Sequence, residues 1–250
     1  LGIRFVMDAL MKGGIPFHMK DAIPNLFAHW ISLDIIAYLR LVSGTGNTRA
    51  NWLRIMNRPN RYIKREALAP FTSDISVAQL KAYYQDKDWM LERLDRLEYD
   101  LSIMKRMSPY AAIHYLSNAM KYQDYLKDYA KEHHINEQEL LDVLNAVHES
   151  SQSCRTFAEW FTYIDTYTEE LQKQAKSPAS KDANNESGVC LCTLHCAKGL
   201  EYPIVFIPDI NEDNIPHARA AVDADLEEER RLFLCWHYTS KGTSSFVLCR

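Results

Sequence analysis

Apolar residues recur every three or four positions along most of this chain, which is the spacing of helices that bury one face. Two stripes are especially regular: Leu94, Leu97, Leu101 and Met104, and then Phe157, Trp160, Phe161, Ile164 and Leu171. We interpret both stripes as protein core rather than as cofactor contacts, because an amphipathic helix turns such a face inward. Residues 49–180 are therefore predicted to be helical throughout.

Helix starts in this stretch are marked by side chains that can accept hydrogen bonds from a first turn. The expected caps are Ser76 with Gln79, Asn136 with Glu139, Thr156 with Glu159, and Ser108 before Pro109. The stretch ends in a polar tract, residues 174–187, which is predicted to be a mobile linker.

Both ends of the chain mix strands with helices. The first end is expected to hold a helix end near Met11, a strand over 15–19 and a helix over 26–42. The last end is expected to hold strands over 189–194, 203–208 and 245–249, with a helix over 226–237. This alternation is typical of α/β proteins with a parallel sheet. We predict one α/β domain, formed by residues 1–48 and 188–250, that is interrupted by an all-helical insert over 49–180.

The composition excludes several classes of protein. Of 250 residues, 47% are hydrophobic and 25% are charged, which is an ordinary globular mixture. The formal net charge is −4, so any nucleic-acid contact has to be local. The chain has no apolar run long enough for a membrane span, no signal-peptide pattern, and six cysteines without a regular framework. We expect a cytoplasmic setting, no membrane partner, and a piece of a longer protein.

The strongest chemical signal follows the expected strand over 189–194. The run TLHCAKGLE, from Thr193 to Glu201, presents a hydroxyl, an imidazole and an ammonium group in a turn, and a glycine permits a tight bend there. Loops at the ends of strands are where α/β sheets bind ligands. This run is therefore a candidate binding loop.

The same run resembles motif V of the superfamily 1 DNA helicases of the UvrD/PcrA/Rep type. Residues 211–233 are similar to the continuation into motif VI, and residues 14–17, 34–39 and 54–61 match the same family. The resemblance implies a second RecA-like domain, called 2A, split by a helical domain, called 2B. ATP with Mg²⁺ would lie between 2A and a first RecA-like domain, 1A, and the domains 1A and 1B are missing from this chain.

Roles for motif V residues are implied by this resemblance. Gly199 and Glu201 would face ATP, with Glu201 on the ribose. Thr193, His195 and Lys198 match the loop that couples the nucleotide cleft to single-stranded DNA.

In motif VI, the resemblance implies a catalytic role for Arg230 and Arg231. The chain does not contain a complete set of catalytic residues. Surface pairing with the neighbouring glutamates is an open alternative for both arginines. The family's arginine for the γ-phosphate corresponds here to Thr239, which carries no charge to stabilise phosphoryl transfer. The parent protein is then a weak or inactive ATPase, or another cation substitutes.

The chain contains no G-x-x-x-x-G-K-[ST] sequence, so it has no P-loop for the phosphates of ATP. The phosphate cradle and the Mg²⁺ site would belong to the missing N-terminal half. We expect this chain alone to be inactive and to hold no bound cofactor.

A second candidate site is a basic segment, residues 49–65, which contains no acidic residue. Its cations are interleaved with Trp52 and Tyr62, which suits phosphate contacts with an option of base stacking. The residues selected as DNA contacts are Arg54, Arg58, Arg61 and Arg65. In the family this region leads to a hairpin that grips duplex DNA, but its glycine-rich turn is replaced here by residues 62–64. A solvated basic face or a hinge contact is the alternative.

A metal site is not expected. Cys190, Cys192, His195 and Cys196 lack the paired C-x₂-C spacing of zinc sites. The sequence as a whole indicates the C-terminal part of an ATP-dependent DNA helicase that translocates on single-stranded DNA and unwinds duplex DNA, in repair or recombination. Two alternatives stay open: the helicase part of a RecB/AddA-like helicase–nuclease, and a degenerate helicase half that only binds DNA or a partner.

Overall fold

The protein is seen here in a computed structural model. The structure describes residues 6–7, 9–11, 13–20, 24–46, 48–72, 74–176, 188–193, 196–197, 202–207, 227, 230 and 240–246. The chain divides into two compact units. Unit 1 comprises Leu1–Ile23 with Leu171–Arg250, and unit 2 comprises Pro24–Glu170.

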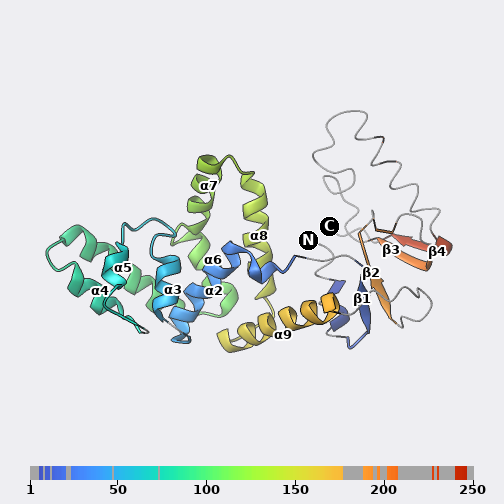
Figure 1. Cartoon of the computed structure of the whole chain (residues 1–250), viewed down its shortest axis with the longest axis horizontal. Helices are drawn as coiled ribbons and strands as arrows, with labels where there is room; N and C mark the ends of the chain where they lie inside the picture. Colours follow the sequence, from blue (N-terminus) through green and yellow to red (C-terminus); the bar gives the residue numbers. More distant parts are fainter. Residues whose placement is uncertain are drawn as a thin grey trace. The chain divides into compact units, whose positions relative to one another are not determined.

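The described residues of unit 1 include two pairs of parallel strands (Figure 1). Strand β1 (Phe17–Met19) pairs with β2 (Val189–Leu191), and β3 (Tyr202–Ile207) pairs with β4 (Ser240–Phe246). The chain leaves unit 1 after β1, forms unit 2, and returns to unit 1 before β2. A small parallel sheet interrupted by helices therefore agrees with the coarse prediction of fold class.

The strand boundaries differ from those that the sequence predicts. β1 and β2 are shorter than expected, and β4 begins at Ser240, five residues before the predicted start. The early start of β4 places Lys241 in a strand. Of the helix expected over 226–237, the described residues are Glu227 and Arg230, and both are helical.

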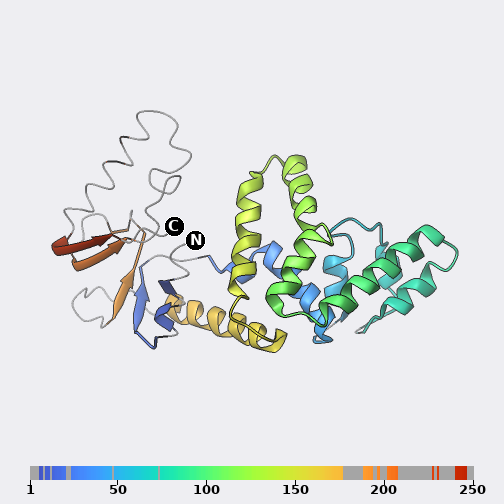
Figure 2. The ribbon, with the colours of Figure 1, turned by 180° about the vertical axis from the view of Figure 1, so that it is seen from behind.

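The described part of unit 2 consists of helices joined by short loops (Figure 2). The 3₁₀ helices are η1 (Leu26–Ala28) and η2 (Arg65–Leu68). The α-helices are α2 (Trp30–Ser43), α3 (Thr48–Ile55), α4 (Val77–Tyr83), α5 (Asp88–Met104), α6 (Pro109–Asn118), α7 (Tyr122–His133), α8 (Glu137–Ser150) and α9 (Phe157–Lys176), of which α9 continues into unit 1 from Leu171. None of these helices is both long and apolar enough to cross a membrane.

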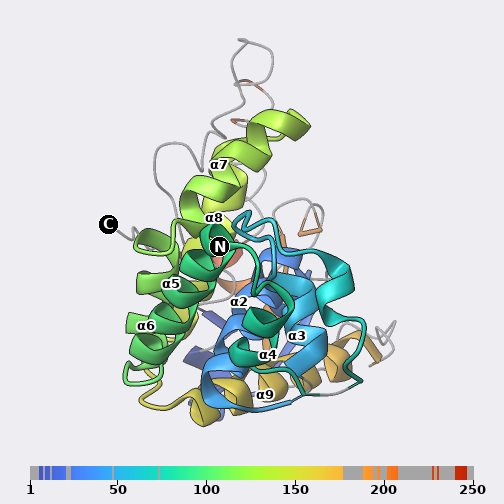
Figure 3. The ribbon, with the colours of Figure 1, turned by 90° about the vertical axis from the view of Figure 1, so that its left-hand side faces the viewer.

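Helix α2 forms the centre of unit 2. It packs against α3, α5, α6, α8 and η1, and Figure 3 shows α5 and α6 on one side of it and α3 on the other. Ile31, Ile35, Tyr38 and Leu39 are completely buried on its inner faces. These contacts place α2 within the helical unit, which begins at Pro24, whereas the sequence division at residue 48 groups it with the α/β part.

The helix expected over 26–42 is interrupted at His29. This residue is extended, with φ −66° and ψ 143°, and separates η1 from α2. Nδ1 of His29 accepts a hydrogen bond from the backbone N–H of Ile31 at 3.3 Å, so the imidazole caps α2. The apolar spacing continues through the break, which is why the periodicity alone predicts a single helix.

The predicted caps and core stripes are confirmed. Ser76 and Gln79 form a complete capping box, and Ser108, Asn136 and Thr156 each accept a backbone N–H of the following turn. Both stripes face the core, with Leu101, Phe157 and Phe161 only half-buried. Helix α9 continues to Lys176, so the first residues of the predicted linker are helical, and residues 177–187 lie outside the described part.

Candidate nucleic-acid interface

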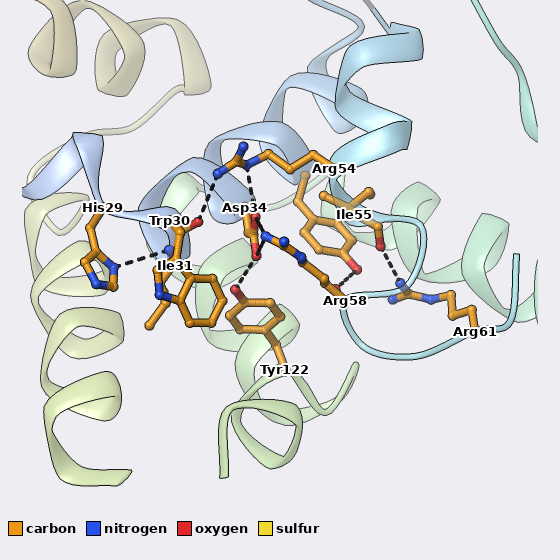
Figure 4. Close-up of polar contacts among 10 residues, drawn as sticks. His29, Trp30, Ile31, Asp34, Arg54, Ile55, Arg58, Arg61 and Tyr122 are labelled. Atoms are coloured by element: carbon orange, nitrogen blue, oxygen red, sulfur yellow. Dashed lines mark hydrogen bonds and ion pairs between the residues drawn. The ribbon is translucent and has the colours of Figure 1, made fainter. Parts of the chain in front are cut away.

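A buried carboxylate, Asp34 of α2, is the centre of a polar network in unit 2 (Figure 4). Nη1 of Arg58 donates to Oδ1 and Oδ2 of Asp34 at 2.8 and 3.1 Å. Nε of Arg54 lies 2.9 Å from Oδ1 as an ion pair without the alignment of a hydrogen bond. The hydroxyl of Tyr122 donates to Oδ2 at 2.9 Å. The side chain of Asp34 is 0% exposed, so these three groups replace its hydration.

The loop after α3 brings the two arginines back to α2. Asn57 organises this loop, because its side chain accepts the backbone N–H of Ile63 at 2.9 Å and donates to the carbonyl of Ile63 at 2.9 Å. The carbonyl of Arg58 accepts a hydrogen bond from Tyr38 at 2.7 Å. Nη2 of Arg54 donates to the carbonyl of Trp30 at 3.4 Å. The guanidinium group of Arg54 is therefore held by a backbone carbonyl as well as by Asp34, whereas Arg58 is fixed through its own carbonyl and through Asp34.

Burial and charge oppose each other at this network. Burial raises the pKa of Asp34, while Arg58, the Tyr122 hydroxyl and Arg54 all favour the ionised carboxylate. Burial and then the nearby charge of Asp34 raise the pKa of Tyr122 well above its ordinary value, so this phenol keeps its proton and donates. Two guanidinium groups share one carboxylate, which leaves an excess of one positive charge.

A cavity of about 440 Å³ opens beside the two arginines and is called the arginine groove here. It is lined by Ala50, Leu53, Arg54, Met56, Asn57, Arg58 and Tyr125. The side chains of Arg54 and Arg58 are 32% and 39% exposed. A guanidinium has five N–H donors, and the contacts described above leave some of them unused on each arginine. The arginine groove can therefore receive an anion.

The structure brings together only part of the predicted basic site. Arg54 and Arg58 meet at Asp34, but Nη1 of Arg61 donates to the carbonyls of Ile55 and Pro59 at 3.1 and 3.2 Å. Arg61 thus holds the loop, and its guanidinium also lies over the ring of Tyr38. Arg65 is exposed on η2. DNA contact by these four residues stays a prediction.

Sequence reasoning did not select Asp34, Tyr122 or Tyr125 as site residues. Asp34 carried a usable signal, because it is the single charged residue before Arg40 in α2. An acid on the buried side of a helix requires a cation or several donors. The basic segment supplies that cation from the next helix and its loop.

The described residues of motif V form the turn after β2. The hydroxyl of Thr193 accepts the backbone N–H of Cys196 at 3.4 Å, and the carbonyl of Thr193 accepts the N–H of Ala197 at 3.1 Å. This geometry is a capped turn at a strand end. His195, Lys198, Gly199 and Glu201 lie outside the described residues.

In motif VI, Arg230 forms a two-pronged ion pair with Glu227. Its Nη2 and Nε lie 2.6 and 2.8 Å from the two carboxylate oxygens, and both side chains are exposed. This is the surface pairing left open by the sequence, and a role at ATP stays a prediction. Arg231 and Thr239 lie outside the described residues.

Cys190 of β2 has a tyrosine hydroxyl as its neighbour. Sγ of Cys190 lies 3.5 Å from the hydroxyl of Tyr202. Across the portion of the chain that the structure describes, no three His, Cys, Asp or Glu side chains gather closely enough to hold a metal ion.

Comparison with known proteins defines the class of this chain. The family model of the UvrD-like helicase C-terminal domain matches residues 3–235, which is nearly the whole sequence. The chain therefore belongs to the UvrD-like helicase C-terminal domain family.

Two relatives show how much of a helicase this chain represents. The ATP-dependent DNA helicase PcrA of Bacillus subtilis is 27% identical over 248 residues, which cover 92% of this chain and 32% of that protein. PcrA of Staphylococcus epidermidis is 26% identical over 250 residues, with 92% and 32% covered. The chain spans about a third of the length of the curated relatives that it matches.

Proposed function

We propose that this chain is the C-terminal part of an ATP-dependent DNA helicase that translocates on single-stranded DNA and unwinds duplex DNA in repair or recombination. The RecA-like domain 2A would include residues 1–23 and 188–250, and the domain 2B would begin with unit 2 at Pro24 instead of at the predicted boundary of residue 48. Membership of the UvrD-like family and the similarity to PcrA helicases support this proposal. The domains 1A and 1B would be its intramolecular partners.

The arginine groove is proposed as the DNA contact of unit 2. The observation that carries this proposal is the sharing of one buried carboxylate, Asp34, by two partly exposed arginines. One positive charge remains uncompensated, and a phosphodiester group carries one negative charge. Charge-assisted hydrogen bonds from guanidinium to phosphate are strong and directional. Asp34 therefore positions Arg54 and Arg58 without cancelling their attraction for a DNA backbone.

ATP would be bound by residues of unit 1 together with the domain 1A. Gly199 and Glu201 would lie on the nucleotide side of motif V, with Arg230 and Arg231 in motif VI. Thr193, His195 and Lys198 would transmit nucleotide state to the DNA. The P-loop and the Mg²⁺ ligands would come from 1A, since the sequence of this chain has no P-loop.

A salt titration tests the groove. We expect Arg54→Gln and Arg58→Gln to weaken binding of a labelled oligothymidylate, measured by fluorescence anisotropy. The slope of log K against log salt should become shallower by roughly one for each phosphate that the variant no longer binds. Arg106→Gln, at an exposed arginine beyond the end of α5, is the matched control. Unchanged affinity and slope in both groove variants would overturn the proposal.

A second candidate function is a degenerate helicase half that binds DNA without driving ATP hydrolysis. Thr239, at the place of the family's γ-phosphate arginine, favours it. DNA-stimulated ATP turnover by the intact parent protein decides between the two, since a degenerate module would show none.

A further inference from the structure

A row of aromatic side chains runs along one face of α7. Tyr122, Tyr125, Tyr129 and His133 are three or four positions apart, so they lie one above another on the helix. Successive ring centroids are separated by 5.6, 6.1 and 3.9 Å. Tyr122 is buried, Tyr125 and Tyr129 are half-buried, and His133 is exposed. The row therefore leads from the Asp34 network to the solvent.

Trp30 joins this row to the arginine groove. Its ring centroid lies 5.0 Å from that of Tyr129, and Cζ of Arg58 lies 5.6 Å from the Trp30 ring centroid. Tyr125 lines the groove itself, beside Arg54 and Arg58. The aromatic rings therefore lie next to the N–H donors of Arg54 and Arg58 that make no contact within the network.

We propose that Trp30, Tyr125, Tyr129 and His133 form a stacking track for the unpaired bases of single-stranded DNA. This inference rests on the proposed function, because the arginine groove would hold the phosphates of the same strand. Proteins that bind single strands without sequence preference combine such a cationic groove with aromatic platforms. The track would supply base contacts that Arg54 and Arg58 cannot supply.

The spacing of the rings favours a single strand over a duplex. Within the track the ring centroids of Tyr125 and Tyr129 are 6.1 Å apart, those of Trp30 and Tyr129 5.0 Å, and those of Tyr129 and His133 3.9 Å. The bases of a duplex rise evenly by about 3.4 Å, so this uneven and mostly wider spacing suits unpaired bases better than a regular duplex stack. A duplex has its bases stacked on each other and would leave the track unused.

The carboxylates on α7 indicate on which side of the rings the DNA backbone would lie. Glu132 acts electrostatically on Tyr125, and Asp128 is exposed on the same helix. These carboxylates repel phosphates, while Arg54 and Arg58 attract them on the groove side. The backbone is therefore expected along the groove, with the bases pointing over the rings.

Abasic DNA separates base stacking from phosphate binding. The whole chain is titrated with a labelled oligothymidylate and with an oligomer of the same length that carries phosphates and abasic sugars only. We expect Tyr129→Leu to weaken oligothymidylate binding by about tenfold and to leave abasic binding unchanged. Tyr125→Leu, at a residue that also lines the groove, should weaken oligothymidylate binding more than abasic binding. Tyr129→Phe, which keeps the ring, should retain the original affinity for both. Tyr99→Leu, at a tyrosine that is 62% exposed on α5, is the matched control.

Each other outcome overturns the track in a distinguishable way. Equal weakening of both oligomers by the leucine variants would mean that the rings only support the groove. No weakening of either oligomer, together with weaker binding in Arg58→Gln, would overturn the track and leave the groove standing. Absence of any binding by the unaltered chain would overturn both proposals.

Discussion

The hydroxyl of Tyr122 lies 2.9 Å from Oδ2 of Asp34 and connects α7 to α2 across 88 positions of sequence. Both side chains are buried, so water cannot replace this hydrogen bond if either partner is removed. The same carboxylate holds Arg54 and Arg58 at the arginine groove. Stability of unit 2 and the geometry of its candidate DNA contact therefore depend on one residue.

Removing the Tyr122 hydroxyl should destabilise the protein by about 1–2 kcal/mol, because a buried hydrogen bond to a charged group disappears. Asp34→Asn should destabilise the protein by a similar amount, since Arg54 and Arg58 lose their counter-charge but are partly exposed, so water can hydrate both guanidinium groups. Urea unfolding followed by circular dichroism measures both changes. Tyr99→Phe is the control on an exposed ring and should change little. Equal unfolding free energies for Tyr122→Phe and Tyr99→Phe would contradict the burial argument.

Tyr62 has a backbone conformation that favours glycine. Its φ is 60°, and its ring is 59% exposed beside the guanidinium of Arg93 at 5.0 Å. We expect Tyr62→Gly to be more stable than Tyr62→Ala by about 1 kcal/mol, because alanine keeps the strain of the left-handed conformation. Both variants lack the ring, so the difference between their urea midpoints reports the backbone alone. A more stable alanine variant would show that the positive φ carries no cost.

Acidification should remove the cap of α2. Burial lowers the pKa of His29 from 6.5, so the unfolded chain binds this proton more readily than the folded chain. The neutral His29 side chain therefore stabilises the fold above pH 6.5. This stabilisation is lost as the pH falls through 6.5 toward the lower pKa of His29 in the folded state. Protonated Nδ1 cannot accept the N–H of Ile31, and we expect a loss of about 0.5–1 kcal/mol.

His29→Asn is the variant that isolates this effect, because asparagine caps a helix without titrating. Burial lowers the pKa of His148 as well, but His148 is present in both proteins and cancels in the comparison. Unfolding free energies at about pH 7.5 and 5.5 should differ less for His29→Asn than for the unaltered chain. Identical pH dependence would assign the acid sensitivity to other groups.

The isolated chain should not turn over ATP. A P-loop supplies most of the contacts to the triphosphate, and the sequence has none. A coupled assay with saturating single-stranded DNA, on protein freed of contaminating ATPases, measures the rate. Turnover that rises in proportion to the purified chain would contradict the assignment of the phosphate site to missing domains.

Local features of unit 2 could be predicted from sequence because their partners are near in the chain. Ser76 needs only Gln79 for its capping box, and the stripe on α5 needs only helical spacing. The break at His29 could not be predicted in this way, because it depends on one extended residue within an unbroken apolar pattern.

The basic segment was visible in the sequence, but its geometry was not. Arg54 and Arg58 are 20 or more positions from Asp34, and Tyr122 is further still. Only the folded arrangement of α2, α3 and α7 shows that two arginines share a carboxylate, while Arg61 donates hydrogen bonds to carbonyl groups of the loop. Charge composition predicted a phosphate site, and tertiary contacts selected which cations are available for it.

The parallel pairing of β1 with β2 has a consequence for synthesis on the ribosome. Phe17 leaves the ribosome long before Val189, its partner in the sheet. At ordinary elongation rates the delay is roughly 10–35 s. Unit 2 is continuous in sequence and can become compact during that interval, which shortens the effective loop between the two strands. The β1 strand is therefore expected to stay unpaired with β2 until unit 2 has folded and β2 has been synthesised.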